Sequence, residues 1–180
     1  MDTEFVHPTA VVEAGAEVGA GTRVWHHAQV RAGARVGAGC VLGKGVFVDS
    51  GAIVGRGTKI QNGVSVYRGV VLGEDVFVGP GAVFTNDLRP RAHAREWDVV
   101  ATVVADGASI GANATIVCGV TLGENCMVGA GSTVTHDVLP HQLVLGNPAR
   151  AAGWVCRCGE TLSRAPEPPA SFVCPACEGR

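Results

Sequence analysis

Large apolar residues recur at every sixth position along the first half of the chain. Between Val6 and Phe84, all fourteen positions of this series are Val, Ile, Leu or Phe. A period of six fits neither the 3.6-residue period of a helix nor the simple alternation of a single strand. It is typical of a repeat architecture in which each hexapeptide forms one short strand and one turn.

Small residues accompany this series. Two residues before most of the large apolar positions lies a small or β-branched residue, and a glycine often follows the apolar position. Glycine suits turns that need unusual backbone angles. The pattern predicts an all-β solenoid with a narrow interior filled by Val, Ile, Leu and Ala, which agrees with a content of only 5% aromatic residues. We expect Cys40 and Cys126 to be buried at small inward positions, and Cys118 to face outward.

The series breaks once. It stops after Phe84 and resumes in a new phase at Val104, and the intervening segment is rich in charged residues and contains Pro90 and Trp97. Loops longer than about 12 residues are usually functional or disordered in compact folds. We therefore predict an inserted loop over residues 85–103 that completes a binding site, with a neighbouring subunit; a disordered tip is the alternative.

Composition narrows the function classes. The chain has 180 residues, of which 47% are hydrophobic, and its net charge is -2. Its 14 basic residues are scattered, so nucleic-acid binding is not expected. No apolar run reaches the roughly 18 residues of a membrane span, and no secretory signal is present, which predicts a cytoplasmic protein. We expect one main domain over residues 1–150 and a small segment over residues 151–180.

Four segments are more specific than the repeat. They are Lys59–Tyr67 (KIQNGVSVY), Phe84–Asp87 (FTND) with Pro90 and Arg91, Gly107–Gly119 (GASIGANATIVCG), and Gly146–Arg150 (GNPAR) followed by Gly153 and Trp154. With these segments the chain resembles the bacterial hexapeptide-repeat N-acetyltransferases of nucleotide-linked amino sugars, in particular those acting on UDP-2-acetamido-3-amino-2,3-dideoxyglucuronate and on related dTDP-3-amino sugars. The resemblance covers roughly residues 5–155.

The resemblance implies a fold and an activity. The fold is a left-handed parallel β-helix in which three hexapeptides make one triangular coil, so that residues 18 apart stack above one another. The family is trimeric, with acetyl-CoA and the nucleotide sugar in clefts between subunits, and the sugar amine attacks the thioester carbonyl. We therefore expect an acetyl-CoA-dependent N-acetyltransferase that acts as a homotrimer on a nucleotide-linked amino sugar, and the resemblance implies a 3-amino sugar.

The resemblance also assigns roles to residues around the break. It gives Asn86 the role of holding the sugar amine, with a turn-stabilising Asn as the alternative. By the 18-residue spacing, Arg68 lies one coil beneath Asn86 with Tyr67 beside it, and both could reach the sugar or its phosphates; a solvated surface pair is the alternative. Asp87 and Arg91, at the start of the inserted loop, are further candidates for substrate binding.

Other candidates lie further along the chain. Gln61 and Asn62 belong to the matching segment and are expected to bind substrate, although an Asn ladder at a corner is the competing explanation. His26 shares the column of Asn62 and is a candidate general base because imidazole titrates near neutrality, although it could equally be an ordinary exposed histidine. The family places the CoA nucleotide near Arg150, and backbone groups of Gly129 and Ala130 are expected to line its arm.

Four cysteines cluster near the C-terminus. Cys156 and Cys158 form one pair, and Cys174 and Cys177 form a second pair 15 residues later. In a reducing compartment two such pairs resemble a zinc ribbon, in which four thiolates hold a structural Zn²⁺. The first pair has C-x-C spacing in place of the usual C-x-x-C, and a disordered reduced tail is the alternative.

Two other functions compete with the acetyltransferase. A non-enzymatic β-helical scaffold would explain the period but not the inserted loop. A metal hydro-lyase of the carbonic-anhydrase type shares the fold but needs three convergent histidines, and the six histidines of this chain lack the required spacing. The sequence leaves open which sugar is acylated, at which ring position, and whether UDP or dTDP carries it.

Overall fold

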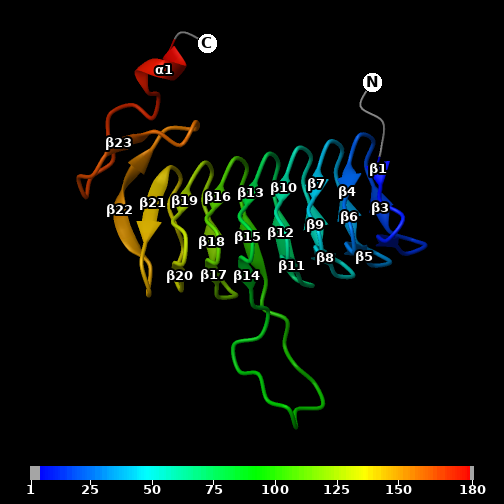
Figure 1. Cartoon of the computed structure of the whole chain (residues 1–180). Helices are drawn as coiled ribbons and strands as arrows, with labels where there is room; N and C mark the ends of the chain where they lie inside the picture. The colour runs from blue at the N-terminus through cyan, green and yellow to red at the C-terminus, as the bar shows by residue number, and fades with distance from the viewer. Residues whose placement is uncertain (1–4, 179–180) are drawn as a thin grey trace.

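Short parallel strands wind into a β-helix in the computed structural model, which describes residues 5–178 (Figure 1). Each full coil contributes one strand to each of three sheets, here named A, B and C. The first two strands, β1 (Phe5–Val6) and β4 (Arg23–Val24), show the rule, because their residues pair 18 positions apart. The predicted all-β parallel β-helix of hexapeptide repeats is confirmed.

The strands are mostly two residues long. After β1 and β4, sheet A continues with β7 (Val41–Leu42), β10 (Lys59–Ile60), β13 (Phe77–Val78), β16 (Ser109–Ile110), β19 (Met127–Val128), β21 (Gln142–Leu145), β22 (Arg150–Val155) and β23 (Thr161–Ser163). Sheet B consists of β2 (Val11–Val12), β5 (Gln29–Val30), β8 (Phe47–Val48), β11 (Ser65–Val66), β14 (Val83–Phe84), β17 (Thr115–Ile116) and β20 (Thr133–Val134). Sheet C consists of β3 (Glu17–Val18), β6 (Arg35–Val36), β9 (Ile53–Val54), β12 (Val70–Leu72), β15 (Thr102–Val104) and β18 (Thr121–Leu122).

The second residue of a two-residue strand points into the interior. Leu42, Ile60 and Val66 are fully buried, whereas the first residue of each of these strands is partly or fully exposed. Val6 and Val12 occupy equivalent positions in the first described coil but remain exposed, because no other coil in residues 5–178 covers that end. The six-residue period therefore arises because every sixth residue packs into a single continuous core.

Three corners join the sheets, and they position the functional residues. The A–B corner contains the turns that follow the strands of sheet A, such as residues 61–64. The B–C corner contains those that follow sheet B, such as residues 67–69. The C–A corner contains those that follow sheet C, such as residues 55–58.

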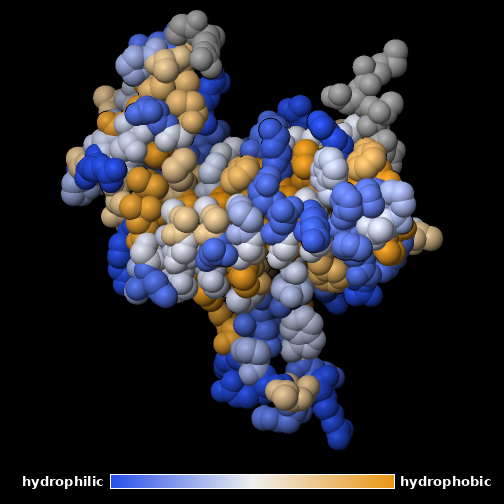
Figure 2. Space-filling model, in the orientation of Figure 1, coloured by the Kyte–Doolittle hydropathy of each residue, from blue (hydrophilic) through white to orange (hydrophobic). Residues whose placement is uncertain are grey.

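The predicted inserted loop leaves from the B–C corner. β14 ends at Phe84 and β15 begins at Thr102, so the loop covers residues 85–101, two residues fewer than predicted, because β15 begins one residue before Val103. The backbone N–H of Val100 donates to the carbonyl of Asn86 at 3.0 Å and closes the loop at its base. The loop projects away from the β-helix and is mostly hydrophilic (Figures 1 and 2).

Sheet A continues into the C-terminal segment. β22 pairs antiparallel with β21, and β23 pairs antiparallel with β22. The predicted boundary at residue 150 thus falls at the first residue of a strand that extends sheet A, not in a linker. The following chain is held by the indole N–H of Trp154, which donates to the carbonyl of Ala165 at 3.1 Å. It ends in the short helix α1 (Pro175–Glu178). No helix in residues 5–178 is long and apolar enough to cross a membrane.

The buried thiols follow the repeat with one exception. Cys40 and Cys126 are buried, as predicted, and burial raises the pKa of both, that of Cys126 to about 12. The prediction for Cys118 is wrong, because only 3% of this residue is exposed. It lies one coil beyond Asn86, and its backbone N–H donates to the hydroxyl of Thr85 at 2.9 Å.

Candidate functional site

Asn86 lies at the base of the inserted loop, on the B–C corner. Its side-chain N–H donates to the carbonyl of Arg68, one coil away, at 3.3 Å. Its backbone carbonyl accepts from Val100. The side-chain oxygen Oδ1 has no hydrogen-bond donor among the described residues, and the residue is partly exposed. The fold thus holds the side-chain amide at its nitrogen and the backbone of Asn86 at its carbonyl, and Oδ1 is left free to accept a hydrogen bond.

Tyr67 and Arg68 lie beside Asn86, as the 18-residue spacing indicates. The Tyr67 ring is 37% exposed and packs against Phe47, with ring centroids 6.1 Å apart. The backbone N–H of Arg68 donates to the carboxylate of Asp49 at 3.3 Å. The Arg68 guanidinium makes no hydrogen bond or ion pair with any residue in the described part of the chain. The corner therefore offers an aromatic ring and a free positive charge next to Asn86.

The two other loop candidates make local contacts. The carboxylate of Asp87 accepts from the backbone N–H of Arg89 at 2.7 Å, which is a turn-stabilising contact. The guanidinium of Arg91 donates to the carbonyl of Pro90 at 2.8 Å and is otherwise exposed. Asp87 shapes the start of the loop, and Arg91 keeps most of its donors available.

Gln61, Asn62, Gly129 and Ala130 lie on a different corner, the A–B corner. The side-chain oxygen of Asn62 accepts from the backbone N–H of Lys44 at 2.9 Å, so Asn62 joins two successive turns. An added Cβ at Gly129 would meet the end of the exposed Leu145 side chain, which is free to move aside. The polar ladder that competes with substrate binding at Asn62 is therefore present in the fold.

His26 also lies on the A–B corner, near the N-terminal end of the β-helix. Its ring stacks on that of His7, with centroids 3.5 Å apart, and it is nearly parallel to the Trp25 ring. Burial, followed by the charges of His26 and His27, lowers the pKa of His7. Within one chain His26 and Asn86 are on different corners and three coils apart, so the fold does not bring them together.

Arg150 lines a hollow of about 440 Å³ at the last coil. Its guanidinium donates to the carbonyl of Ala149 at 2.9 Å, and the same hollow is lined by His136, which lies on the B–C corner two coils beyond Asn86. With adjacent strands about 4.8 Å apart, Asn86 and His136 are separated by roughly 10 Å along this corner. Arg150 and Asn86 therefore belong to the same side of the molecule.

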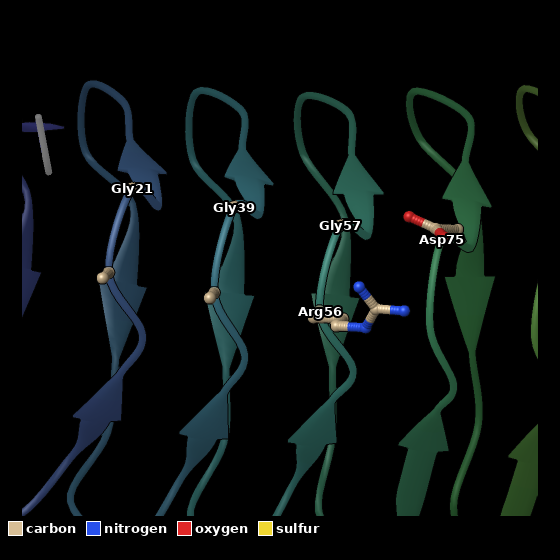
Figure 3. Close-up of a pocket in the computed structure, with 7 residues that line it drawn as sticks. Gly21, Gly39, Arg56, Gly57 and Asp75 are labelled. Atoms are coloured by element: carbon tan, nitrogen blue, oxygen red, sulfur yellow. The ribbon is translucent and has the colours of Figure 1, made fainter. Parts of the chain in front are cut away.

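The third corner contains none of the predicted site residues. Figure 3 shows Gly21, Gly39, Gly57 and Asp75 at equivalent places of four successive coils, with the Arg56 side chain between the last two. Arg56 forms an ion pair with Glu74 at 2.8 Å, and this pairing raises its pKa. The open hollow of about 460 Å³ at this corner is thus lined by small residues and an already paired arginine.

The four C-terminal cysteines come together, although Cys156 and Cys177 are 21 residues apart in sequence. Their Sγ atoms all lie within 4.8 Å of one another, and they are the single group of metal-ligating side chains in residues 5–178. Backbone N–H groups, that of Cys158 first and that of Cys174 second, lower the pKa of the Cys156 thiol to about 6. The Cys158 thiol raises the pKa of Cys177 to about 12. A tetrahedral ZnS₄ site with bonds of about 2.3 Å needs sulfur atoms about 3.8 Å apart, so the cluster fits Zn²⁺.

One feature of the B–C corner was not identified as a site from sequence. Trp97, from the inserted loop, lines a hollow of about 510 Å³ together with Arg68 and residues of the two preceding coils, which are Arg31, Asp49, Ser50 and Gly51. The 18-residue spacing aligns Arg31 with Asp49, but it says nothing of the loop. In the sequence, the feature that could have indicated this site is an aromatic residue, Trp97, within a charged loop.

Solved structures with the same fold include three bacterial acetyltransferases. PerB from Caulobacter crescentus, in complex with CoA and GDP-perosamine, is 24% identical over 84% of this chain and 57% of its own, with a TM-score of 0.54. The acetyltransferase domain of PglB from Neisseria gonorrhoeae, in complex with acetyl coenzyme A, is 23% identical over 83% and 58%, with a TM-score of 0.56. A hexapeptide-repeat acetyltransferase from Vibrio cholerae, also with acetyl coenzyme A, is 29% identical over 64% and 67%, with a TM-score of 0.56.

The chain thus spans less than three fifths of the length of the first two of these structures. No curated protein matches it. The family description "Bacterial transferase hexapeptide (six repeats)" matches residues 51–86 and 101–136, on either side of the inserted loop. A second description, "Hexapeptide repeat of succinyl-transferase", matches residues 32–68, and the two together cover about half of the chain. The chain therefore belongs to the bacterial hexapeptide-repeat transferases.

Proposed function

We propose that the chain is an acetyl-CoA-dependent N-acetyltransferase that acylates the amino group of a nucleotide-linked amino sugar. The observation that carries this proposal is the fixed amide of Asn86, whose free Oδ1 faces solvent beside the unpaired Arg68. The Vibrio cholerae and Neisseria gonorrhoeae proteins, of the same fold, were solved with acetyl coenzyme A, and PerB with CoA and an amino-sugar nucleotide. The 3-amino position rests on the resemblance of the four sequence segments.

The chemistry needs orientation more than activation. The lone pair of a neutral sugar amine attacks the thioester carbonyl, the carbon–sulfur bond breaks, and the amine proton passes to the departing thiolate, so the products are an amide and CoA thiol. Asn86 Oδ1 can accept a hydrogen bond from the amine and thereby direct its lone pair at the carbonyl carbon. Correct placement of two reactants supplies a large part of the rate increase in such a reaction.

The distribution of the candidates supports a homotrimer. Asn86, Arg68 and Arg150 lie along or near the B–C corner, whereas Gln61 and Ala130 lie on the A–B corner. One chain cannot place both corners around the same ligand, because a full sheet separates them. A ring of three subunits sets the B–C corner of one chain against the A–B corner of the next, and every site is then complete.

The remaining candidates fit this arrangement. Arg150, in its hollow at the last coil, provides a positive charge for the phosphates of CoA, and roughly 10 Å of corner lies between that coil and Asn86 for the pantetheine arm. A structural Zn²⁺ held by Cys156, Cys158, Cys174 and Cys177 would fix the C-terminal segment, and four thiolates leave it no open position for catalysis. A reducing, cytoplasmic compartment suits these thiols.

The test is release of free CoA thiol. The purified protein is incubated with acetyl-CoA and UDP- or dTDP-linked 3-amino and 4-amino sugars, and the thiol is measured with a chromogenic disulfide. Thiol release that requires the amino sugar, with a mass increase of one acetyl group on the sugar nucleotide, is the expected result. The matching sugar nucleotide with a hydroxyl in place of the amine is the control. Absence of release with every amino-sugar nucleotide would contradict the proposal.

A further inference from the structure

Trp97 stands at the border between the inserted loop and the β-helix. Its side chain is 55% exposed, although a large aromatic ring gains most from burial. It faces the body of the β-helix across the hollow of about 510 Å³, whose remaining lining residues are Arg31, Asp49, Ser50, Gly51 and Arg68. The size is in the range of small-molecule sites, which are roughly 300–1,000 Å³.

Some charged side chains of this hollow are paired within the fold and one is not. Arg31 forms an ion pair with Asp49 at 3.0 Å and a longer one with Glu13 at 3.9 Å. Asp49 also accepts the backbone N–H groups of Ser50 at 2.8 Å and of Arg68 at 3.3 Å. Its carboxylate is therefore satisfied within the fold. The Arg68 guanidinium has no partner in the described part of the chain, so the hollow carries one uncompensated positive charge.

An exposed indole and an unpaired guanidinium in one hollow suit a particular chemistry. A planar aromatic ring stacks on any nucleobase, and a guanidinium binds the oxygens of a phosphate through paired hydrogen bonds. The backbone carbonyl of Arg68 also accepts a hydrogen bond from the Asn86 side-chain N–H, so an anion bound by Arg68 lies within one coil of the Asn86 side chain. A sugar attached to that anion can therefore reach Asn86.

We propose that this hollow binds the nucleoside diphosphate of the substrate, with the base stacked on Trp97 and the diphosphate on Arg68. The Ser50 hydroxyl is the neighbouring polar group available to the ribose. This assignment rests on the proposed function for the identity of the attached sugar, but binding of the nucleoside diphosphate itself does not require acetyl transfer. Trp97 thereby becomes a binding residue of the inserted loop, and the loop contributes to the binding of the nucleotide carrier.

The test measures binding of UDP and dTDP to the intact protein by calorimetry, in the absence of acetyl-CoA. Trp97→Ala is expected to raise the Kd for the preferred diphosphate roughly tenfold or more, because base–aromatic stacking is lost. Trp97→Phe keeps an aromatic face and is expected to stay within about threefold of the unchanged protein. Leu88→Ala is the matched control, since Leu88 is equally exposed, at 58%, in the same loop.

Arg68→Gln is expected to raise the Kd for UDP more than the Kd for uridine, because only UDP carries the phosphates. None of the substitutions should change the Kd for acetyl-CoA. The proposal is overturned if neither diphosphate binds the unchanged protein, if Trp97→Ala and Leu88→Ala weaken binding equally, or if uridine and UDP lose affinity equally in Arg68→Gln.

The same variants separate this inference from the proposed function. If UDP binds through Trp97 but no amino-sugar nucleotide gives CoA thiol, the acetyltransferase assignment alone fails. If thiol is released and Trp97→Ala leaves the KM for the sugar nucleotide unchanged, the assignment of the hollow alone fails.

Discussion

Thr58 and Thr102 are both fully buried at small inward positions, but only one hydroxyl is hydrogen-bonded. The Thr58 hydroxyl donates to the carbonyl of Gly73 at 2.9 Å and accepts from the backbone N–H of Val76 at 3.1 Å. The Thr102 hydroxyl has no partner among the described residues. It lies where the inserted loop rejoins the β-helix.

Valine at these two positions should have opposite effects on stability. Thr102→Val removes an unpaired buried hydroxyl and is expected to raise the free energy of unfolding by about 1 kcal/mol. Thr58→Val breaks a hydroxyl contact and leaves a backbone N–H and a carbonyl unpaired, so it should lower that free energy by about 1–2 kcal/mol. Urea unfolding followed by circular dichroism measures both. Equal destabilisation by the two substitutions would contradict the assignment of an unpaired hydroxyl at Thr102.

Asn86 gives the second prediction at the residue scale. Asn86→Ala removes the oxygen that we propose holds the amine, and it is expected to lower kcat roughly a hundredfold, the cost of a misplaced reactant. Asn86→Asp keeps an acceptor at the same place and should lose less. Thiol release under saturating acetyl-CoA measures kcat, and thermal unfolding verifies that both variants are folded. An unchanged kcat in Asn86→Ala would mean that a group other than Asn86 holds the amine.

Residues on regular coils could be placed from the sequence, and residues next to the loop could not. The 18-residue spacing puts Arg68 beneath Asn86, and their 3.3 Å hydrogen bond shows the same neighbourhood. It also gives Cys118 an outward position, yet the residue is buried beside the returning end of the loop. Val100 from that end lies 3.1 Å from where a Cβ on Gly119 would be. A period describes stacked turns but has no information on a segment that crosses them.

The elements that interrupt the regular coils carry most of the chemistry. The inserted loop, residues 85–101, is a connection between β14 and β15 and brings Trp97 to the B–C corner. The C-terminal segment is expected from the sequence as a small appendage, and in the structure β22 joins it to sheet A in the antiparallel direction. Sequence reasoning could find both interruptions from the broken period and the cysteine pairs. It could not find the antiparallel turn, because residues 146–149 fit either a linker or a hairpin.

Zinc is the prediction that belongs to this C-terminal element. We expect one equivalent of Zn²⁺ per chain by elemental analysis, bound through the four thiolates. Cys158→Ser should abolish this stoichiometry and increase proteolysis after residue 155, while the circular dichroism of the β-helix stays unchanged. The β-helix core is independent of the cluster, since its buried residues form one continuous set from Val24 to Val144. Full zinc content in Cys158→Ser, or loss of the β-structure, would contradict this separation.

At the scale of the whole molecule, the proposed site residues are divided between two corners of the β-helix. The B–C corner carries Asn86, Arg68 and the inserted loop, and the A–B corner carries Gln61 and Asn62. Both corners follow from the period, and the resemblance implies a trimer, but the division of the proposed site residues between two corners follows only from the sheet assignment. A sheet of parallel strands lies between the corners and blocks contact within one chain.

A trimer with sites between subunits should show complementation. Asn86→Ala and Gln61→Ala chains carry different affinity tags, are co-expressed, and are purified through both tags, so every trimer contains both kinds of chain. In a cyclic trimer of either composition, only one of the three junctions joins an intact B–C corner to an intact A–B corner. We therefore expect about one third of the unchanged activity, although each variant alone is impaired. If both corners served one site within a single chain, the mixed trimers would be no more active than their parents, because every chain would carry one damaged half.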